Sequence, residues 1–291
     1  MISFKQINKN NKNVLNSMID KALSFNELNE DLYRQYKDLD VFTLLKLRKR
    51  LFLIFQDRIC IGFIWLEKTD YKLYRIHSLY LDKVKENIDF GDNLHFLQNK
   101  DTLYYECRLN PFNKNVLEYQ GFIKKNHTIE MKMDLEGYIS AEVNIELNLK
   151  IFEENKDEAL RCQLQNEIFD SIRRIPLSLK DIFNDESQNY YIKGASYFLN
   201  LNGEDIGYGQ LIEHDYKNSV TLVNFGLKKE YRKKGYGSLF LNLVINEGKK
   251  LGFKTIFLRV SPDNNEAVKL YSRIGFRTCS NIVNYEYKVK K

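Results

Sequence analysis

Three consecutive cations and two glycines stand in the stretch EYRKKGYGSLF, residues 230–240, just before an apolar run. A helix that starts here leaves about four backbone N–H groups unpaired and carries roughly half a positive charge at its first turn. Gly235 and Gly237 would let an anion reach those N–H groups without meeting a Cβ. The pattern is typical of a phosphate-binding turn, and a solvated basic turn is the alternative with the same composition.

Spacing excludes two common phosphate-binding motifs. A Walker loop needs Gly-Lys followed by Ser or Thr after four residues from its first glycine, and the chain has no such run. A dinucleotide fingerprint needs a third glycine where Phe240 stands, and an acidic residue at the end of the next strand, where Arg259 stands. Any ligand of the loop therefore belongs to another class.

A second polar pair follows in the segment SPDNNEAVKLYSRIGF, residues 261–276. Asn264 and Tyr271 are seven residues apart, which is two helical turns or about 10 Å along one face. Asp263 and Glu266 have the spacing of a capping box, and Gly275 can end the helix. An amide and a phenol on one helix face could line one extended ligand.

The elements that must position these residues form a mixed α+β (α/β) plan. Asn202-Gly203 predicts a tight hairpin within residues 197–214, and Ser219–Leu227 predicts a third strand in which Gly226 marks a bulge or a close approach. Ahead of the hairpin we expect a first strand over Glu142–Phe152 and a first helix over Lys156–Phe169. After the third strand we expect a helix from Ser238 to the Gly252 cap, a strand over Thr255–Val260 and a closing strand over residues 283–289.

The first half of the chain is a faint copy of the second. Residues 107–133 align with residues 258–289 on Arg, Pro, Asn and Gly-Phe positions, and Leu51–Lys68 resembles the hairpin of the second half. The region Leu81–Lys100, which corresponds to the cation-glycine loop, has one glycine and several acids. Only the second half is therefore equipped to hold an anion.

Composition limits the classes of protein to which the chain can belong. The chain has 291 residues, enough for two domains, and a net charge of +6 that is not clustered as a nucleic-acid footprint would be. The four cysteines form no CxxC pair and have no histidine at ligand spacing, so we expect reduced, buried thiols and no metal site. No apolar window approaches a membrane span, and residues 1–13 have no apolar core of a leader, so we expect a cytoplasmic protein.

The glycine loop, strand and second helix together resemble the GNAT superfamily of acyl-CoA N-acyltransferases. The family signature is Arg or Gln, two residues, Gly, one residue, and Gly or Ala, which Arg232–Gly237 matches. A later family motif is matched by Asn264, Ala267, Leu270-Tyr271 and Gly275-Phe276. The short signature is weak alone, and the two motifs at this separation are specific. The resemblance covers about residues 140–291, and the first half more weakly.

This resemblance implies how acetyl-CoA would bind. Pantetheine would lie along Thr221–Leu227 like an added strand, with Gly226 permitting the bulge that opens the sheet, and the pyrophosphate would lie on the N–H groups of residues 233–238. The residues that the resemblance assigns to the cofactor are Phe225, Gly226, Leu227, Arg232, Lys233, Lys234, Gly235, Tyr236, Gly237, Ser238 and Asn264. Asn264 is also a natural helix N-cap, and the two roles are compatible.

The implied reaction is N-acetylation by direct attack of an amine on the thioester. Tyr271 is then the candidate general acid for the leaving thiolate, and its alternative role is packing the helix onto the sheet. The general base stays unassigned, since the third strand has no carboxylate and Glu213 and His214 lie at a hairpin end. Because this carboxylate is missing, a non-catalytic acyl-CoA sensor or scaffold stays the alternative function. A nucleic-acid-binding module is a weaker alternative.

We therefore expect tandem GNAT-like domains, each with a mixed, mostly antiparallel sheet flanked by helices. Residues 1–137 would form a degenerate domain without cofactor binding, which shapes the acceptor pocket or completes the sheet, and residues 138–291 the N-acetyltransferase domain. The expected partner is a small-molecule or peptide amine, with no nucleic acid and no membrane, and a homodimer is compatible with the resemblance. The acceptor pocket should come from residues 19–46 and 161–187, where no motif identifies the amine.

Overall fold

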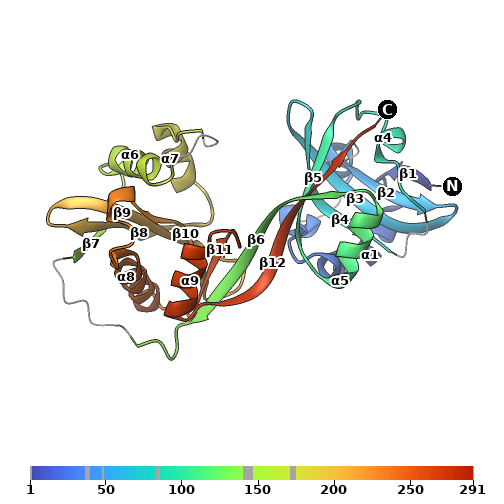
Figure 1. Ribbon diagram of the computed structural model, residues 1–291. Coiled ribbons are helices and arrows are strands. Elements are labelled where there is room, and N and C mark those ends of the chain that lie inside the picture. Colours follow the sequence, from blue (N-terminus) through green and yellow to red (C-terminus); the bar gives the residue numbers. More distant parts are fainter. Residues whose placement is uncertain are drawn as a thin grey trace. The chain divides into compact units, whose positions relative to one another are not determined.

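A computed structural model describes residues 2–36, 40–47, 49–82, 86–139, 147–170 and 175–290. The chain divides into two compact units (Figure 1). The first unit contains residues 1–128 and 280–291, and the second contains residues 129–279. Each unit is built around its own part of a mixed sheet, and each takes one strand from the other half of the sequence.

The first unit has a sheet with the strand order β1-β2-β3-β4-β5-β12. All of its neighbouring pairs are antiparallel except β4 and β5, which are parallel. The strands are β1 (Ile2–Gln6), β2 (Leu51–Gln56), β3 (Ile59–Asp70), β4 (Leu73–Leu81), β5 (Thr102–Arg108) and β12 (Arg277–Lys288). The hairpin of β2 and β3 confirms the strand-turn-strand unit predicted within Leu51–Lys68.

Short helices accompany this sheet. The described helices of the first unit are α1 (Lys12–Phe25), α2 (Leu32–Gln35), α3 (Val41–Leu47), α4 (Phe90–Asn93) and α5 (Pro111–Tyr119). α1 packs on β3 and β4 through an apolar stripe in which Leu15, Ala22 and Phe25 are buried. α5 starts at a capping box between Asn110 and Asn113, which fixes the turn after β5.

The second unit has the strand order β6-β11-β10-β9-β8-β7. The strands are β6 (Ile123–Asp134), β7 (Leu147–Ile151), β8 (Tyr191–Leu201), β9 (Glu204–Glu213), β10 (Ser219–Leu227) and β11 (Thr255–Val260). Asn202 and Gly203 both have positive φ in the turn between β8 and β9, which confirms the predicted tight hairpin. Residues 142–146 of the predicted first strand lie outside the described residues.

Helices cover both faces of this sheet, with α6 and α7 on one side and α8 and α9 on the other (Figure 1). The helices are α6 (Glu158–Ile168), α7 (Leu179–Glu186), α8 (Tyr236–Lys250) and α9 (Asn265–Ile274), with a 3₁₀ turn, η1 (Lys229–Tyr231), before α8. α8 buries Phe240, Leu241, Val244 and Ile245 in the core of the unit, which explains why an apolar run follows the glycine loop.

The boundary between the units differs from the expected division at residue 137. Residues 129–137 belong to the second unit and residues 280–291 to the first. Within β6, Ile129–Asp134 pairs with β11, and within β12, Ile282–Lys288 pairs with β5. Both strands have 12 residues. Each is therefore long enough that one of its ends pairs within the unit whose other residues come mainly from the opposite half of the sequence. The closing strand over residues 283–289 thus completes the first unit.

The four cysteines, all among the described residues, form no disulfide with one another, and they are less buried than expected. Cys107 is buried, Cys60 and Cys162 are partly buried, and Cys279 is exposed. Burial raises the pKa of the Cys107 thiol to about 12, so it stays protonated at neutral pH. The expectation of four buried thiols is therefore wrong for Cys279, which lies in the stretch of β12 beside Glu130 rather than in a core.

Candidate active site

Two central strands of the second unit separate at the candidate site. β10 and β11 are parallel, and Ser219–Leu222 pairs with Thr255–Leu258. Beyond these residues β10 continues to Leu227 and β11 to Val260 without a further pair between them. The backbone edge of β10 that faces the opening is therefore available to an extended ligand.

A β-bulge lies on β10 at the opening. Val223 pairs with Gln210 and Gly226 with Tyr208, so the stretch from Val223 to Gly226 holds one residue more than the facing stretch of β9. Asn224 has a φ of 52°, a left-handed conformation that asparagine tolerates better than most residues. The bulge was expected at this strand.

Gly226 was expected to mark a bulge or a close approach, and the close approach is what the structure shows, made by side chains of Ile168 and Phe169. The φ of Gly226 is not positive, and a Cβ at this position would lie 2.5 Å from Ile168 Cγ2 and 3.3 Å from the ring of Phe169. The glycine is therefore needed because the end of α6 packs closely on β10, and Asn224 supplies the unusual backbone angle of the bulge.

The glycine loop presents a row of backbone N–H groups. No described residue accepts a hydrogen bond from the amides of residues 233–237, while the amide of Ser238 donates to Gly235 O at 3.1 Å. Lys233 and Gly235 have positive φ values of 61° and 87°, which turn the chain into α8. The helix starts at Tyr236, two residues before the predicted start, because left-handed Gly235 acts as its N-cap. Successive free amides at a helix start can bind an anion.

The three loop cations differ in what they contact. Arg232 donates through Nε to Leu227 O at 2.9 Å and through Nη2 to Ile168 O at 2.7 Å. Lys233 forms an exposed ion pair with Glu266 at 2.8 Å, and Lys234 lies over the ring of Tyr231 at 5.7 Å. Arg232 thus ties the loop to β10 and α6, and its guanidinium is engaged within the protein.

Asn264 caps α9, as its position before the helix suggests. Its side-chain oxygen accepts a hydrogen bond from Ala267 N at 3.2 Å. The predicted capping box of Asp263 and Glu266 is wrong, because Asp263 lies one residue before the cap and donates its amide to Ser261 Oγ. Gly275 ends the helix with a φ of 123°, which confirms the predicted stop.

Tyr271 lies beside the bulge. Its ring centroid is 6.4 Å from that of Phe225 and 6.0 Å from that of Phe276, and only 9% of the residue is exposed. Burial raises the pKa of Tyr271 to about 12, so the phenol keeps its proton at neutral pH. No described residue forms a hydrogen bond with the hydroxyl, which leaves it able to serve a ligand. The structure thus brings together Tyr271, the bulged strand and the glycine loop.

A cavity of about 300 Å³ lies on the other side of β10, between α6, α7 and the bulge. Asp181, Asp185, Tyr190 and Asn224 line it together with Arg161, and the segment of residues 161–187 that was expected to form the acceptor pocket supplies most of the wall. Asp185 is paired with the lining Arg161, so Asp181 is the lining carboxylate whose charge favours a cationic ligand.

A buried polar network connects this cavity with the bulge. Arg161 is 1% exposed; it forms an ion pair with Asp185 and donates to Gln210 Oε1 at 3.2 Å. Asn224 Nδ2 donates to the same Gln210 oxygen at 3.3 Å, and Tyr190 donates to Asp185 at 3.0 Å. The network fixes the side chain of the left-handed bulge residue.

Sequence reasoning missed these network residues individually. Arg161 stands on the buried face of α6 with Leu164 and Ile168, where a charge is unusual, and Gln210 stands in the buried run of β9. A charged or amide residue at an apolar position was the available signal.

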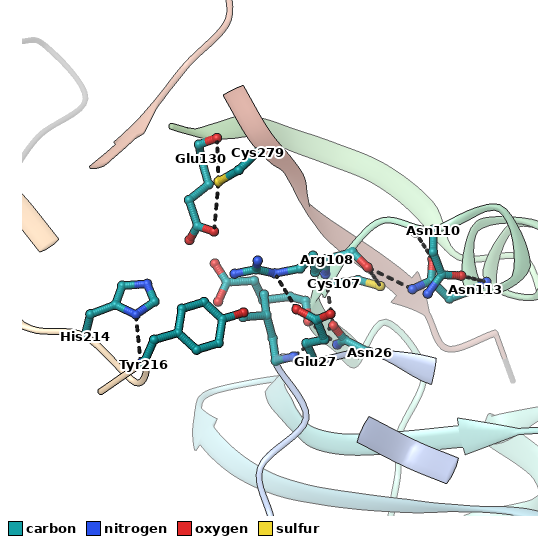
Figure 2. A network of polar contacts seen from close by, with 12 residues as sticks. Asn26, Glu27, Cys107, Arg108, Asn110, Asn113, Glu130, His214, Tyr216 and Cys279 are labelled. Carbon is teal, nitrogen blue, oxygen red and sulfur yellow. Dashed lines mark hydrogen bonds and ion pairs between the residues drawn. The ribbon is translucent and has the colours of Figure 1, made fainter. Parts of the chain in front are cut away.

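Glu213 and His214 lie away from the bulge. Glu213 pairs with Val220, three residues along β9 from Gln210, which is about 10 Å at the rise of a strand. His214 stacks on Phe257 with 4.0 Å between ring centroids, and its Nδ1 accepts the amide hydrogen of Tyr216 at 3.1 Å (Figure 2). Neither residue is placed to act at the opening of the strands.

The first unit has a similar opening between β4 and β5, which pair only over Leu73–Arg75 and Thr102–Tyr104. The segment after α1 fills it. Asn29 Oδ1 accepts the amide hydrogen of Leu79 at 3.1 Å, and its Nδ2 donates to Leu79 O at 2.9 Å. Asn26 makes the same kind of bonds to β5. It accepts from Arg108 N at 2.9 Å (Figure 2), and it donates to Glu106 O at 2.9 Å. In this unit the opening holds the chain's own side chains.

Among the described residues there is no group of three His, Cys, Asp or Glu side chains that could hold a metal ion. None of the helices in the described ranges is long and apolar enough to cross a membrane.

A mixed sheet that opens between two parallel strands, with a bulged strand and a glycine loop leading into a helix, defines the acyltransferase fold of the second unit. Residues 161–276 match the acetyltransferase (GNAT) family, so the second unit carries an acyltransferase domain of that family. Over 110 residues, 38% of this chain and 70% of the relative, the chain is 27% identical to the [ribosomal protein bS18]-alanine N-acetyltransferase of Escherichia coli. It is 29% identical over 120 residues to an uncharacterised N-acetyltransferase of Bacillus subtilis, covering 41% and 76% of the two chains.

Solved structures match the whole chain. A GCN5-related N-acetyltransferase from Sphaerobacter thermophilus has a TM-score of 0.68 at 14% identity, with 100% of this chain and 96% of that chain covered. A tandem GNAT protein from the clavulanic acid biosynthesis pathway has a TM-score of 0.60 at 13% identity, with 100% and 99% covered. The expected tandem fold is thereby confirmed, and the first unit is also GNAT-like in structure.

Proposed function

We propose that the protein is an acetyl-CoA-dependent N-acetyltransferase that works in its second unit. The observation that carries the proposal is the coincidence of the open edge of β10 with five backbone amides, residues 233–237, that no described residue uses. An extended thioester ligand with a pyrophosphate needs these two features, a strand edge and an anion site.

The residues fit acetyl-CoA as substrate. Pantetheine would add to β10 at Phe225, Gly226 and Leu227, and the pyrophosphate would take the amides of the loop, where Gly237 keeps the approach free of a side chain. Lys234 is exposed and adds positive charge, while the exposed Lys233 is paired with Glu266. Arg232 acts on the site by clamping the loop to β10 and α6 through two carbonyl groups.

The acceptor amine would enter from the cavity beside the bulge. Its ammonium form is attracted by Asp181, while Asp185 is paired with Arg161, and it must lose a proton before it attacks. The nitrogen then bonds to the thioester carbonyl carbon, and a backbone N–H of the bulged strand stabilises the oxyanion. The carbon–sulfur bond breaks, and coenzyme A leaves as a thiolate.

Tyr271 would protonate the leaving sulfur. Its pKa of about 12 means that the phenol carries its proton throughout the neutral range. Burial that disfavours the phenolate also disfavours a thiolate in the same place, which raises the proton affinity of the leaving group. The phenol is therefore a proton donor held close to the bulge by packing against Phe225.

Calorimetric titration of acetyl-CoA and a thiol-release assay test the proposal together. We expect binding at one site per chain and thiol release with at least one amine of a panel of polyamines, amino acids and peptides. The panel includes a peptide with N-terminal alanine, because the E. coli relative is named for an alanine acceptor. Binding without release over the panel would favour the sensor alternative, and the absence of binding would overturn the proposal.

A further inference from the structure

A second cavity lies in the first unit, away from all residues assigned to acyl transfer. Its volume is about 680 Å³, and its walls come from β1–β4 and from the segment after α4. Small-molecule sites typically measure roughly 300–1,000 Å³. The cavity contains no residue of the glycine loop or of the parted strands, so it goes beyond the function proposed above.

The short helix α4 explains why the cavity exists. In the second unit the corresponding connection carries α8, whose 15 residues pack against β8, β9 and β10. In the first unit α4 has four residues and contacts β1, and only Phe90 and Gly91 of this helix are buried. A face of the sheet that a long helix covers in one unit is thus left hollow in the other.

The floor of the cavity is apolar and aromatic. Phe52 and Leu66 of the sheet and Leu94 after α4 are buried and line it. Phe96 stacks on Phe52 with 5.7 Å between ring centroids and an interplanar angle of 24°, and it lies 5.9 Å from Tyr74. Such walls bind flat or extended apolar groups by burying their surface.

The rim of the cavity is positively charged. Lys49 and Lys68 are exposed lining residues, and neither forms an ion pair with a described residue. The lining Glu67 is already paired with Arg50 at 2.6 Å, so it does not offset the two lysines. Two free ammonium groups at the edge of an apolar floor complement an anion.

We propose that this cavity binds a small amphipathic carboxylate, with its apolar body on Phe52 and Phe96 and its charge held by Lys49 and Lys68. The first unit then has a ligand site of its own, built where the helix of the second unit's cofactor loop is missing. Because that site lies on the α4 side of the sheet, it is independent of the segment around Asn26 and Asn29 that fills the opening between β4 and β5.

Calorimetry with 2-naphthoate tests the inference on the full chain, with 2-naphthylmethanol and 2-naphthylmethylamine as neutral and cationic partners of the same shape. We expect naphthoate to bind at one site per chain at least tenfold more tightly than the amine. The double variant Lys49→Glu/Lys68→Glu should lower naphthoate affinity about tenfold and leave the alcohol within about twofold, because only the carboxylate interacts with the two charges.

Two further variants make the outcome decisive. Phe96→Ala should weaken naphthoate and naphthylmethanol alike, by about fivefold, since the stacked ring of the floor is lost. Gly237→Glu should leave naphthoate binding unchanged, which separates this site from the acyl-CoA site even if the latter proves wrong. No binding of naphthoate at millimolar concentration, equal affinity for the amine, or loss of binding in Gly237→Glu would overturn the inference.

Discussion

The two units open their sheets at equivalent places and differ in what occupies the opening. In the second unit β10 and β11 do not pair beyond Leu222 and Leu258, and no described residue accepts a hydrogen bond from the loop amides of residues 233–237. Between β4 and β5 of the first unit, Asn26 and Asn29 bond to the backbone of both strands. Under the proposed function, the opening of the second unit receives an extended ligand, whereas the opening of the first unit is closed by the chain's own side chains.

Under the proposed function, this closure indicates that two side chains are enough to block the place where a cofactor would bond. An asparagine side chain carries one carbonyl and one NH₂ group, so it can pair with a strand as a peptide group does. Asn29 uses both groups on Leu79, and Asn26 uses both on β5. The GNAT-like sheet keeps its shape, while the place where a ligand backbone would bond is taken.

The largest effect should come from Gly237→Glu in the second unit. The added carboxylate would lie among the loop amides and repel a pyrophosphate, so acetyl-CoA affinity should fall by about a thousandfold or more. Gly237→Ala is the matched control, because its Cβ would meet Leu270 at 3.6 Å, an ordinary contact. Titration calorimetry should give the alanine variant an acetyl-CoA affinity within about threefold of the wild type. Equal acetyl-CoA affinity of the two variants would show that the loop is not part of the cofactor site.

In the first unit, Asn29→Ala should lower the free energy of unfolding by about 3 kcal/mol, since it leaves the Leu79 N–H and C=O and the Tyr105 hydroxyl without this partner. Denaturant titration measures the loss, with the exposed Asn10→Ala as a control within about 0.5 kcal/mol. The stoichiometry of acetyl-CoA binding should stay at one per chain. A second bound molecule would mean that Asn29 alone had blocked an intact site.

Tyr271→Phe should lower kcat by about thirtyfold and leave the affinity for acetyl-CoA within about twofold, since it removes a proton donor and keeps the ring. The pKa of about 12 means that the wild-type phenol stays protonated from pH 6 to 10, so the ratio of the two kcat values should be constant over that range. A ratio that falls towards one above pH 8 would show that another group is the acid.

The smallest effect should come from charge changes in the first unit's equivalent of the glycine loop. Asp92→Lys in α4 should leave acetyl-CoA affinity within about twofold, because this four-residue helix does not serve the cofactor. A loss as deep as that of Arg232→Ala, measured in the same titration, would contradict the assignment of acyl-CoA binding to the second unit alone.

Local sequence signals predicted the second unit well. Asn202-Gly203 gave the hairpin, and the cation-glycine stretch gave the start of α8 within two residues, because turn and cap chemistry depend on neighbouring residues. A close approach at Gly226 was one of two expected explanations, but local signals could not identify the residue that approaches. The contact that excludes a Cβ comes from Ile168, which lies 58 positions earlier in the chain.

Long-range pairing was the part that sequence could not supply. β6 and β12 are similar 12-residue strands, and nothing in their composition tells which end pairs with β11 or β5. Arg161 and Asn224 were missed for a related reason: their meaning depends on Gln210, a buried partner far from Arg161 in the chain and on the strand facing Asn224. The motif residues of the candidate site could be predicted because family spacing, rather than a contact, identifies them.

The exchange of strands sets an order for the folding of the chain. The sheet of the first unit needs residues 282–288, which follow the whole second unit in sequence. During synthesis β5 must therefore wait with an unpaired edge while more than 170 residues are added, a long-range closure that is slow compared with hairpin formation. The N-terminal unit is then the last to become complete, and an exposed edge during that interval is where association with other chains would begin.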